Sequence, residues 1–159
     1  MAVRRARAGA VHLVRRVDVL FALVFIILFL STSAVFAEVQ TRVRIIEASN
    51  VGSSIDPSLG DVHDQLGTLF NFTSYRLLRE LNLNLVGNRP VEVPIHAGRS
   101  MEVTLFGQYL KTVELRIRVR RDGMNILNTQ VRLSHGRTVL IGGPQHGEGV
   151  IILAISARF

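Results

Sequence analysis

The chain has 159 residues, 48% of them hydrophobic, with 19 basic and 12 acidic side chains and a formal net charge of +7. It contains no cysteine, which excludes a disulfide framework and thiolate chemistry. Stability must therefore come from packing alone, and the length beyond an N-terminal leader suffices for one domain.

The N-terminal segment has the three parts of a secretory signal. Five arginines precede residues 19–30, which contain no polar side chain, and Val35 and Ala37 occupy the positions that signal peptidase requires for cleavage before Glu38. The nineteen residues 19–37 also carry no charge, which is about the length that crosses a bilayer as a helix. Residues 1–37 are therefore interpreted as a signal peptide, with an uncleaved signal anchor as the alternative.

Both outcomes place residues 38–159 outside the cytosol, in the periplasm or secreted, and membrane-associated through residues 19–37 if the leader is not cleaved. The leader holds five of the 19 basic residues and one of the 12 acidic ones, which leaves 14 against 11, or +3, for the rest. That balance is ordinary for a protein surface. The high overall charge therefore reflects targeting and gives no support to nucleic-acid binding.

The first elements after the leader are a strand and a helix. Apolar and polar residues alternate over 39–47, which predicts a half-buried strand. Asp56 and Pro57 then supply an N-cap and a first helical residue, and a helix is expected over about 57–70. Its apolar face is Leu59, Val62, Leu66, Leu69 and Phe70, opposite Asp61, His63, Asp64 and Gln65. We expect this helix to pack one side on a sheet.

The rest of the chain reads as strands separated by turn residues. They are expected at 73–86, 91–95, 101–106, 112–120, 126–133, 138–141 and 150–157, with a mobile glycine-rich hairpin loop at 142–149. Pro94 predicts an edge strand, and the nearly continuous apolar residues of the last two strands predict burial on both faces. The fold class is mainly β with one early helix (α+β): residues 38–159 form a single β-rich domain. Its architecture is a β-sandwich or partly open barrel of seven to eight strands, with the helix covering one end.

The hairpin around Asp122 and Gly123 allows a prediction of register. A simple two-residue turn would place Leu115 opposite Gln130 and mix the two faces of the sheet. A loop of odd length instead pairs apolar with apolar residues on one face and Glu114 with Arg132 on the other. The odd loop is therefore predicted, with the pairs Val113–Leu133, Leu115–Val131, Ile117–Thr129 and Val119–Leu127.

Three segments together resemble small exported β-domain proteins of Gram-negative bacteria that have no assigned function. These are Ile55, Asp56 and Pro57 at the start of the helix, the run from Phe72 through Tyr75 to Leu78, and residues 149–155 after a glycine-rich loop. The resemblance implies a location in the cell envelope. It transfers no active-site residues.

Motifs for catalysis are not found in the sequence. There is no Gly-x-Ser-x-Gly motif, and the histidines show no metal-ligand spacing, so we predict a protein that is not an enzyme and needs no cofactor. In a meander, however, alternate turns fall at the same end, which would gather His96, Asp122, His146 and Glu148 on one rim. These residues are interpreted as polar turn residues, with a metal- or small-ligand-binding rim site as the alternative.

Arg116, Arg118 and Arg120 alternate along one strand, and the predicted register places Arg132 beside Glu114 on the same surface. Three like charges in a row repel one another unless acidic groups pair with them. This face is therefore the candidate binding face for another envelope protein or an acidic surface. The predicted function is an exported, non-enzymatic binding or assembly module of the cell envelope.

A different class of protein is suggested by the C-terminus. Phe159 follows the alternating apolar residues Ile151, Leu153, Ile155 and Ala157, as in the closing strand of a small outer-membrane β-barrel. The opposite face of the same strand is apolar too, where a small barrel needs a polar lumen. The barrel is kept as the alternative function.

Overall fold

The structure is a computed structural model that describes residues 38–96 and 98–159. The predicted leader, cleaved or retained as an anchor, lies outside these residues. Within the described ranges, no helix combines the length and the apolar character needed to cross a bilayer.

The described chain forms eight strands and one short helical segment. The strands are β1 (Val39–Ser49), β2 (Ser74–Leu85), β3 (Pro90–His96), β4 (Arg99–Gln108), β5 (Thr112–Arg121), β6 (Met124–Ser134), β7 (Thr138–His146) and β8 (Gly149–Arg158). They build two four-stranded sheets, here called sheet A, in the order β2-β1-β8-β7, and sheet B, in the order β3-β4-β5-β6. Every pairing within the two sheets is antiparallel.

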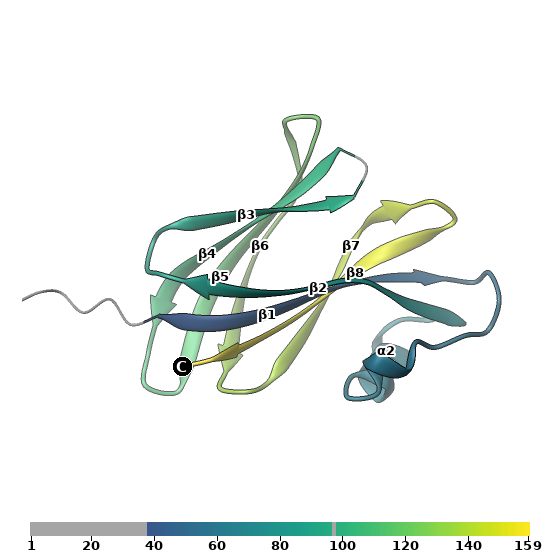
Figure 1. Ribbon diagram of the computed structural model, residues 1–159, viewed down its shortest axis with the longest axis horizontal. Helices are drawn as coiled ribbons and strands as arrows, with labels where there is room; N and C mark the ends of the chain where they lie inside the picture. The colour runs from purple at the N-terminus through teal and green to yellow at the C-terminus, as the bar shows by residue number, and fades with distance from the viewer. Residues whose placement is uncertain (1–37, 97) are drawn as a thin grey trace, which may run out of the picture. The chain divides into compact units, whose positions relative to one another are not determined.

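The two sheets are arranged as a flattened meander (Figure 1). The chain passes from sheet A to sheet B between β2 and β3 and returns between β6 and β7, and neither of these pairs is hydrogen-bonded as neighbouring strands. The sheets therefore face each other without closing into a barrel. The predicted fold class, a mainly β sandwich with one early helical segment, is confirmed. Pro94 lies on β3, an edge strand of sheet B, as predicted.

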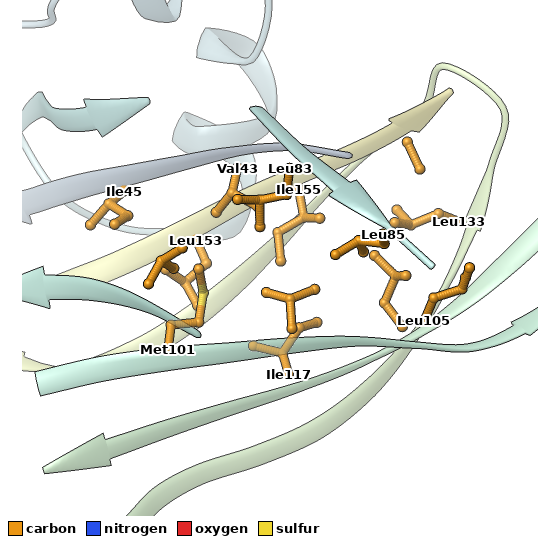
Figure 2. Packing of buried hydrophobic residues seen from close by; sticks show 14 of the residues in the cluster. Val43, Ile45, Leu83, Leu85, Met101, Leu105, Ile117, Leu133, Leu153 and Ile155 are labelled. Carbon is orange, nitrogen blue, oxygen red and sulfur yellow. The ribbon is translucent and has the colours of Figure 1, made fainter. Parts of the chain in front are cut away.

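The main core lies between the sheets and is built from every second residue of the strands (Figure 2). Val43, Leu83 and Ile155 from sheet A meet Met101 and Ile117 from sheet B. All four inward-facing residues of β5, at positions 113, 115, 117 and 119, are fully buried. The alternation seen in the sequence is thus the alternation between the core and the outer face.

A second apolar cluster lies on the outer face of sheet A, beneath the helical segment. Leu59, Val62 and Leu66 are buried there against Ile152 and Ala154 of β8. Because β8 is covered on one side by sheet B and on the other by this segment, it is apolar on both faces, as predicted.

The helical segment is not the continuous helix expected over 57–70. It consists of a 3₁₀ turn, η1 (Pro57–Leu59), and a short helix, α2 (His63–Leu69). The hydrogen bonds between them span three residues, including the one from Gly60 N–H to the Pro57 carbonyl, and glycine is a poor helix former. The expected apolar face is correct at Leu66 but wrong at Leu69, whose side chain is exposed.

Asp56 and Tyr75 attach this segment to the rest of the domain. The Tyr75 hydroxyl donates to the carbonyls of Leu66 (3.2 Å) and Phe70 (2.7 Å). One carboxylate oxygen of Asp56 accepts hydrogen bonds from the backbone N–H and the hydroxyl of Ser58, which lowers the pKa of Asp56, and the other accepts from the Leu77 N–H of β2 at 3.3 Å. In the described structure these residues therefore have a structural role.

The β5–β6 hairpin has the predicted register but not the predicted loop. All four apolar-face pairs and the Glu114–Arg132 pair are present. The loop, however, is the two-residue turn of Asp122 and Gly123, with φ values of 49° and 80°. A β-bulge beside the turn produces the predicted pairing. Val119 pairs with Leu127 while Arg120 pairs with Asn125, so Ile126 is an extra residue on β6 that shifts the register by one.

The glycine-rich stretch 142–149 was expected to be a hairpin loop, and this expectation is wrong. Residues 142–146 continue β7, and the turn into β8 contains only Gly147 and Glu148. Packing explains the glycines: a Cβ at Gly142 would lie 3.3 Å from the Phe70 ring, and one at Gly143 would lie 2.9 Å from the Ile151 carbonyl oxygen. They are needed because other groups approach the backbone closely.

Candidate binding face

The outer faces of the two sheets differ in what covers them. On sheet A, the helical segment buries Ile46, Ile152 and Ala154. On sheet B, the outward residues of β5 are partly exposed, and on β4 Phe106 is exposed. The predicted binding face therefore lies on the sheet whose outer residues are not buried by the helical segment.

Two arginines of β5, Arg118 and Arg120, share one carboxylate. Glu102 of β4, whose side chain is 12% exposed, lies 3.1 Å from Arg118 Nη1 and 3.3 Å from Arg120 Nη2. Arg120 also donates through Nε to Asn125 Oδ1 at 3.3 Å. The register between β4 and β5 places Glu102 opposite Arg118. The sheet itself therefore supplies one of the carboxylates that were expected to come from a partner.

Arg116 has a different neighbour. Its guanidinium carbon lies 4.7 Å from the centroid of the Phe106 ring, a cation–π contact that leaves the charge without a carboxylate partner in the described structure. Arg132 pairs with Glu114 across the β5–β6 ladder, and this hydrogen bond raises the pKa of Arg132. Its guanidinium also lies 5.9 Å from the ring of Tyr109.

A shallow pocket of about 310 Å³ lies between these groups. Its walls include Phe106, Glu114, Gln130 and Arg132, so one aromatic ring, one acid, one amide and one cation face the same space. Together with Arg116, Arg118, Arg120 and Glu102, these residues are called the sheet B face below.

The residues of the predicted rim fall into two groups. The β3–β4 and β5–β6 turns do approach each other, since a Cβ at Gly98 would lie 3.5 Å from Asp122 Oδ1. On sheet A, His146 Nε2 lies 3.6 Å from Glu47 Oε1, and Glu148 lines a pocket of about 380 Å³ with Glu47 and Arg76.

His96 ends β3 beside the undescribed residue 97, and its side chain lies outside the described part. Among the described side chains, no group of three histidine, aspartate or glutamate residues is arranged to hold a metal ion.

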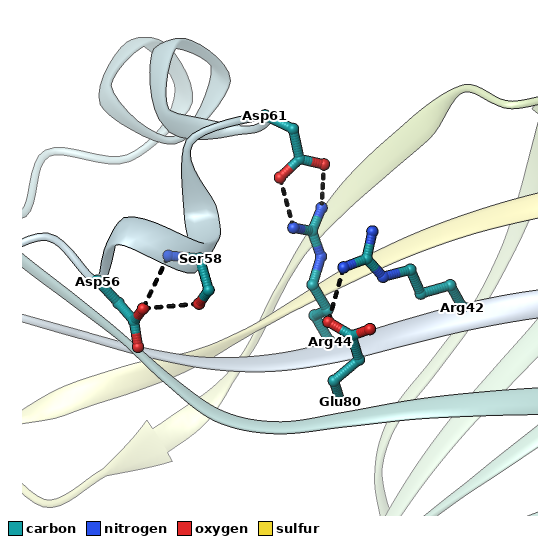
Figure 3. Close-up of polar contacts among 6 residues, drawn as sticks. All are labelled: Arg42, Arg44, Asp56, Ser58, Asp61 and Glu80. Atoms are coloured by element: carbon teal, nitrogen blue, oxygen red, sulfur yellow. Dashed lines mark hydrogen bonds and ion pairs between the residues drawn. The ribbon is translucent and has the colours of Figure 1, made fainter.

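A charged network on the outer face of sheet A was missed by the sequence analysis (Figure 3). Arg44, 2% exposed, forms two hydrogen bonds with Asp61, of 2.6 and 2.9 Å, and Arg42 bonds Glu80 at 2.7 Å. These bonds lower the pKa values of Asp61 and Glu80. Arg44 joins β1 to the segment between η1 and α2, so the network has a structural role.

Comparison with known proteins adds no relative: no protein-family model, no curated protein and no solved structure matches the chain. The argument for function therefore depends on the surface of the domain.

Proposed function

We propose that residues 38–159 are an exported, non-enzymatic binding module of the cell envelope, which docks an acidic surface of another envelope protein on the sheet B face. The observation that carries the proposal is the difference between the outer faces: the helical segment covers one, and the other exposes arginines beside aromatic rings.

The composition of the sheet B face suits protein recognition. Arginine, tyrosine and phenylalanine are enriched in interfaces because they combine large contact areas with directional polar groups. Arg118 and Arg120 share the single carboxylate of Glu102, and Arg116 has no carboxylate partner among the described residues, which leaves a positive surplus along the strand. Acidic side chains of a partner would complete these ion pairs, with Arg116 as the cation most available to them.

The first test removes the positive charge of the three outward-facing arginines of β5. The variant Arg116→Gln, Arg118→Gln, Arg120→Gln is expected to weaken capture of the partner from detergent-solubilised envelopes by about tenfold or more at low salt. Binding of the unchanged protein should itself weaken as salt shortens the Debye length to about 10 Å and below. Capture is measured by pull-down across a salt series.

The matched control removes the same charge elsewhere, through Arg89→Gln, Arg137→Gln and Arg158→Gln, and should leave capture unchanged. Adding Glu102→Gln to the test variant avoids an unpaired carboxylate, so a thermal melt can separate lost folding from lost binding. Capture that is equal for test and control variants at every salt concentration would return the arginines of β5 to a merely solvated face.

The location in the envelope is tested by the mature N-terminus. Mass spectrometry of the protein purified from its host is expected to find Glu38 as the first residue, because Val35 and Ala37 fit signal-peptidase cleavage. An intact N-terminus in the membrane fraction would establish the anchored form instead, and an intact N-terminus in the cytosol would contradict export.

A further inference from the structure

One end of the sandwich holds residue 38, where the described chain begins, and three turns (left side of Figure 1). The β2–β3, β4–β5 and β6–β7 turns lie at residues 86–89, 109–111 and 135–137. Register places them together with the start of β1, since Val39 pairs with Leu85 and Thr112 pairs with Ser134. Residue 38, which directly follows the leader in the sequence, therefore lies at the same end; this end is called the entry end.

The β4–β5 turn at the entry end exposes apolar side chains. Leu110 is 94% exposed at its tip, next to the exposed Tyr109. The turn is closed by a hydrogen bond from Tyr109 N–H to the Thr112 carbonyl at 2.8 Å, so Leu110 is held outward by an ordered backbone. Turns are usually made of polar residues, so Leu110 and Tyr109 together give this turn an unusual apolar tip.

Four cations lie at the same end of the sandwich. Arg89, Lys111, Arg137 and Arg158 are exposed, and none of them forms an ion pair with a described residue. The acidic side chains of the same end are Glu38 and Glu114, and Glu114 is already paired with Arg132. The entry end therefore carries a positive surplus.

The opposite end also exposes apolar side chains, among them Leu69 and Met124, but its connections differ in charge. Its connections carry Asp56, Asp61, Asp64, Asp122 and Glu148. The two ends therefore differ in charge. Four cations without an ion-pair partner among the described residues lie at the entry end, whereas acids lie at the other end, of which Asp61 and Asp122 pair with Arg44 and Arg121.

We infer that the entry end docks on the surface of an anionic bilayer, with Leu110 and Tyr109 entering the headgroup region and the four cations contacting lipid phosphates. The inference rests on the exported location given under the proposed function, but it uses a surface separate from the arginines of β5. Cations flanking exposed aromatic and aliphatic side chains are the chemistry of interfacial membrane binding. If the leader is retained as an anchor, which is the alternative to cleavage before Glu38, the uncharged residues 19–37 precede this end in the sequence by a single residue. In that form of the protein, a bilayer is favoured over a soluble protein as the occupant.

The chain offers a direct probe, because it contains no tryptophan. The variant Leu110→Trp is prepared as the full chain and reconstituted in vesicles of phosphatidylcholine and phosphatidylglycerol, with and without brominated acyl chains. Its tryptophan emission is expected to shift to the blue and to fall about twofold with brominated lipid. The matched control, Met124→Trp, places the probe on an exposed residue next to the β5–β6 turn at the opposite end, where neither change is expected.

The charge requirement is tested in the Leu110→Trp background. Changing Arg89, Lys111, Arg137 and Arg158 to glutamine should abolish most of the quenching in anionic vesicles, whereas Arg116→Gln, Arg118→Gln and Arg120→Gln should leave it unchanged. The triple variant of β5 also distinguishes this inference from the proposed function, because it is expected to weaken capture of the protein partner and to leave contact with the bilayer intact. A Leu110→Trp probe that stays solvent-exposed and unquenched, or quenching equal to that of Met124→Trp, would overturn the inference.

Discussion

Replacing Leu66 by aspartate is expected to lower the free energy of unfolding by about 4 kcal/mol or more. Leu66 is fully buried between α2 and the outer face of sheet A, in contact with the cluster that includes Ile152 and Ala154. The substitution removes apolar contacts and places a carboxylate where the described cluster offers no cation. Urea unfolding followed by circular dichroism measures the loss.

The same helix provides the controls. Leu69→Asp makes the identical substitution at a side chain that is 63% exposed, and His63→Ala alters a half-exposed one. Both are expected to change stability by less than about 1 kcal/mol. If Leu66→Asp and Leu69→Asp had equal effects, the face of α2 that packs on sheet A would be assigned wrongly.

The second large effect is expected at the ion pair between β1 and the helical segment. Asp61→Asn should lower the free energy of unfolding by about 2 kcal/mol at neutral pH. Arg44 is 2% exposed and would lose its charged partner, while the 53% exposure of the Asp61 side chain keeps the cost below that of a fully buried pair. The control Asp64→Asn removes an equal charge from a fully exposed side chain nearby and should be close to neutral.

Low pH should remove the difference in stability between the unchanged protein and Asp61→Asn. The hydrogen bonds from Arg44 hold the pKa of Asp61 below its ordinary value. The stabilisation is therefore present above the unfolded pKa, about 3.9, and is lost as the pH falls from there through the lowered folded pKa. The gap in unfolding free energy between the unchanged protein and Asp61→Asn should shrink between about pH 5 and pH 3. A gap that stays constant over this range would mean that the charge of Asp61 is not what stabilises the contact.

Local patterns in the sequence were sufficient to predict the strands and the β5–β6 register. Side-chain alternation has a period of two, so the requirement that apolar residues share one face fixes the pairing of Val113 with Leu133. The same requirement did not identify the loop. An odd loop and a two-residue turn followed by a bulge at Ile126 produce the same pairs beyond the bulge, and only the backbone distinguishes them.

Features that depend on distant residues were not predictable in this way. The interruption of the helix is coupled to Arg44, and the extended backbone at Gly142 is coupled to the Phe70 ring. On the sheet B face, the arginine stripe was evident from the alternation of β5. The contribution of Glu102 required the register between β4 and β5, and that of Phe106 required its position beneath Arg116.

The strand order also constrains how the domain can fold. Every hydrogen-bonded pair of strands is consecutive in the sequence, with one exception. β1 pairs with β8, so that Gln40 meets Arg158 across 118 positions of the chain. Such a contact has a high loop-closure entropy and forms late. Until β8 is available, β1 lacks one of its two partners and the helical segment lacks Ile152 and Ala154 beneath it. Sheet A therefore cannot reach its four-stranded form until residues 149–158 are available. For the exported protein proposed above, this topology would delay folding of sheet A until β8 has crossed the membrane.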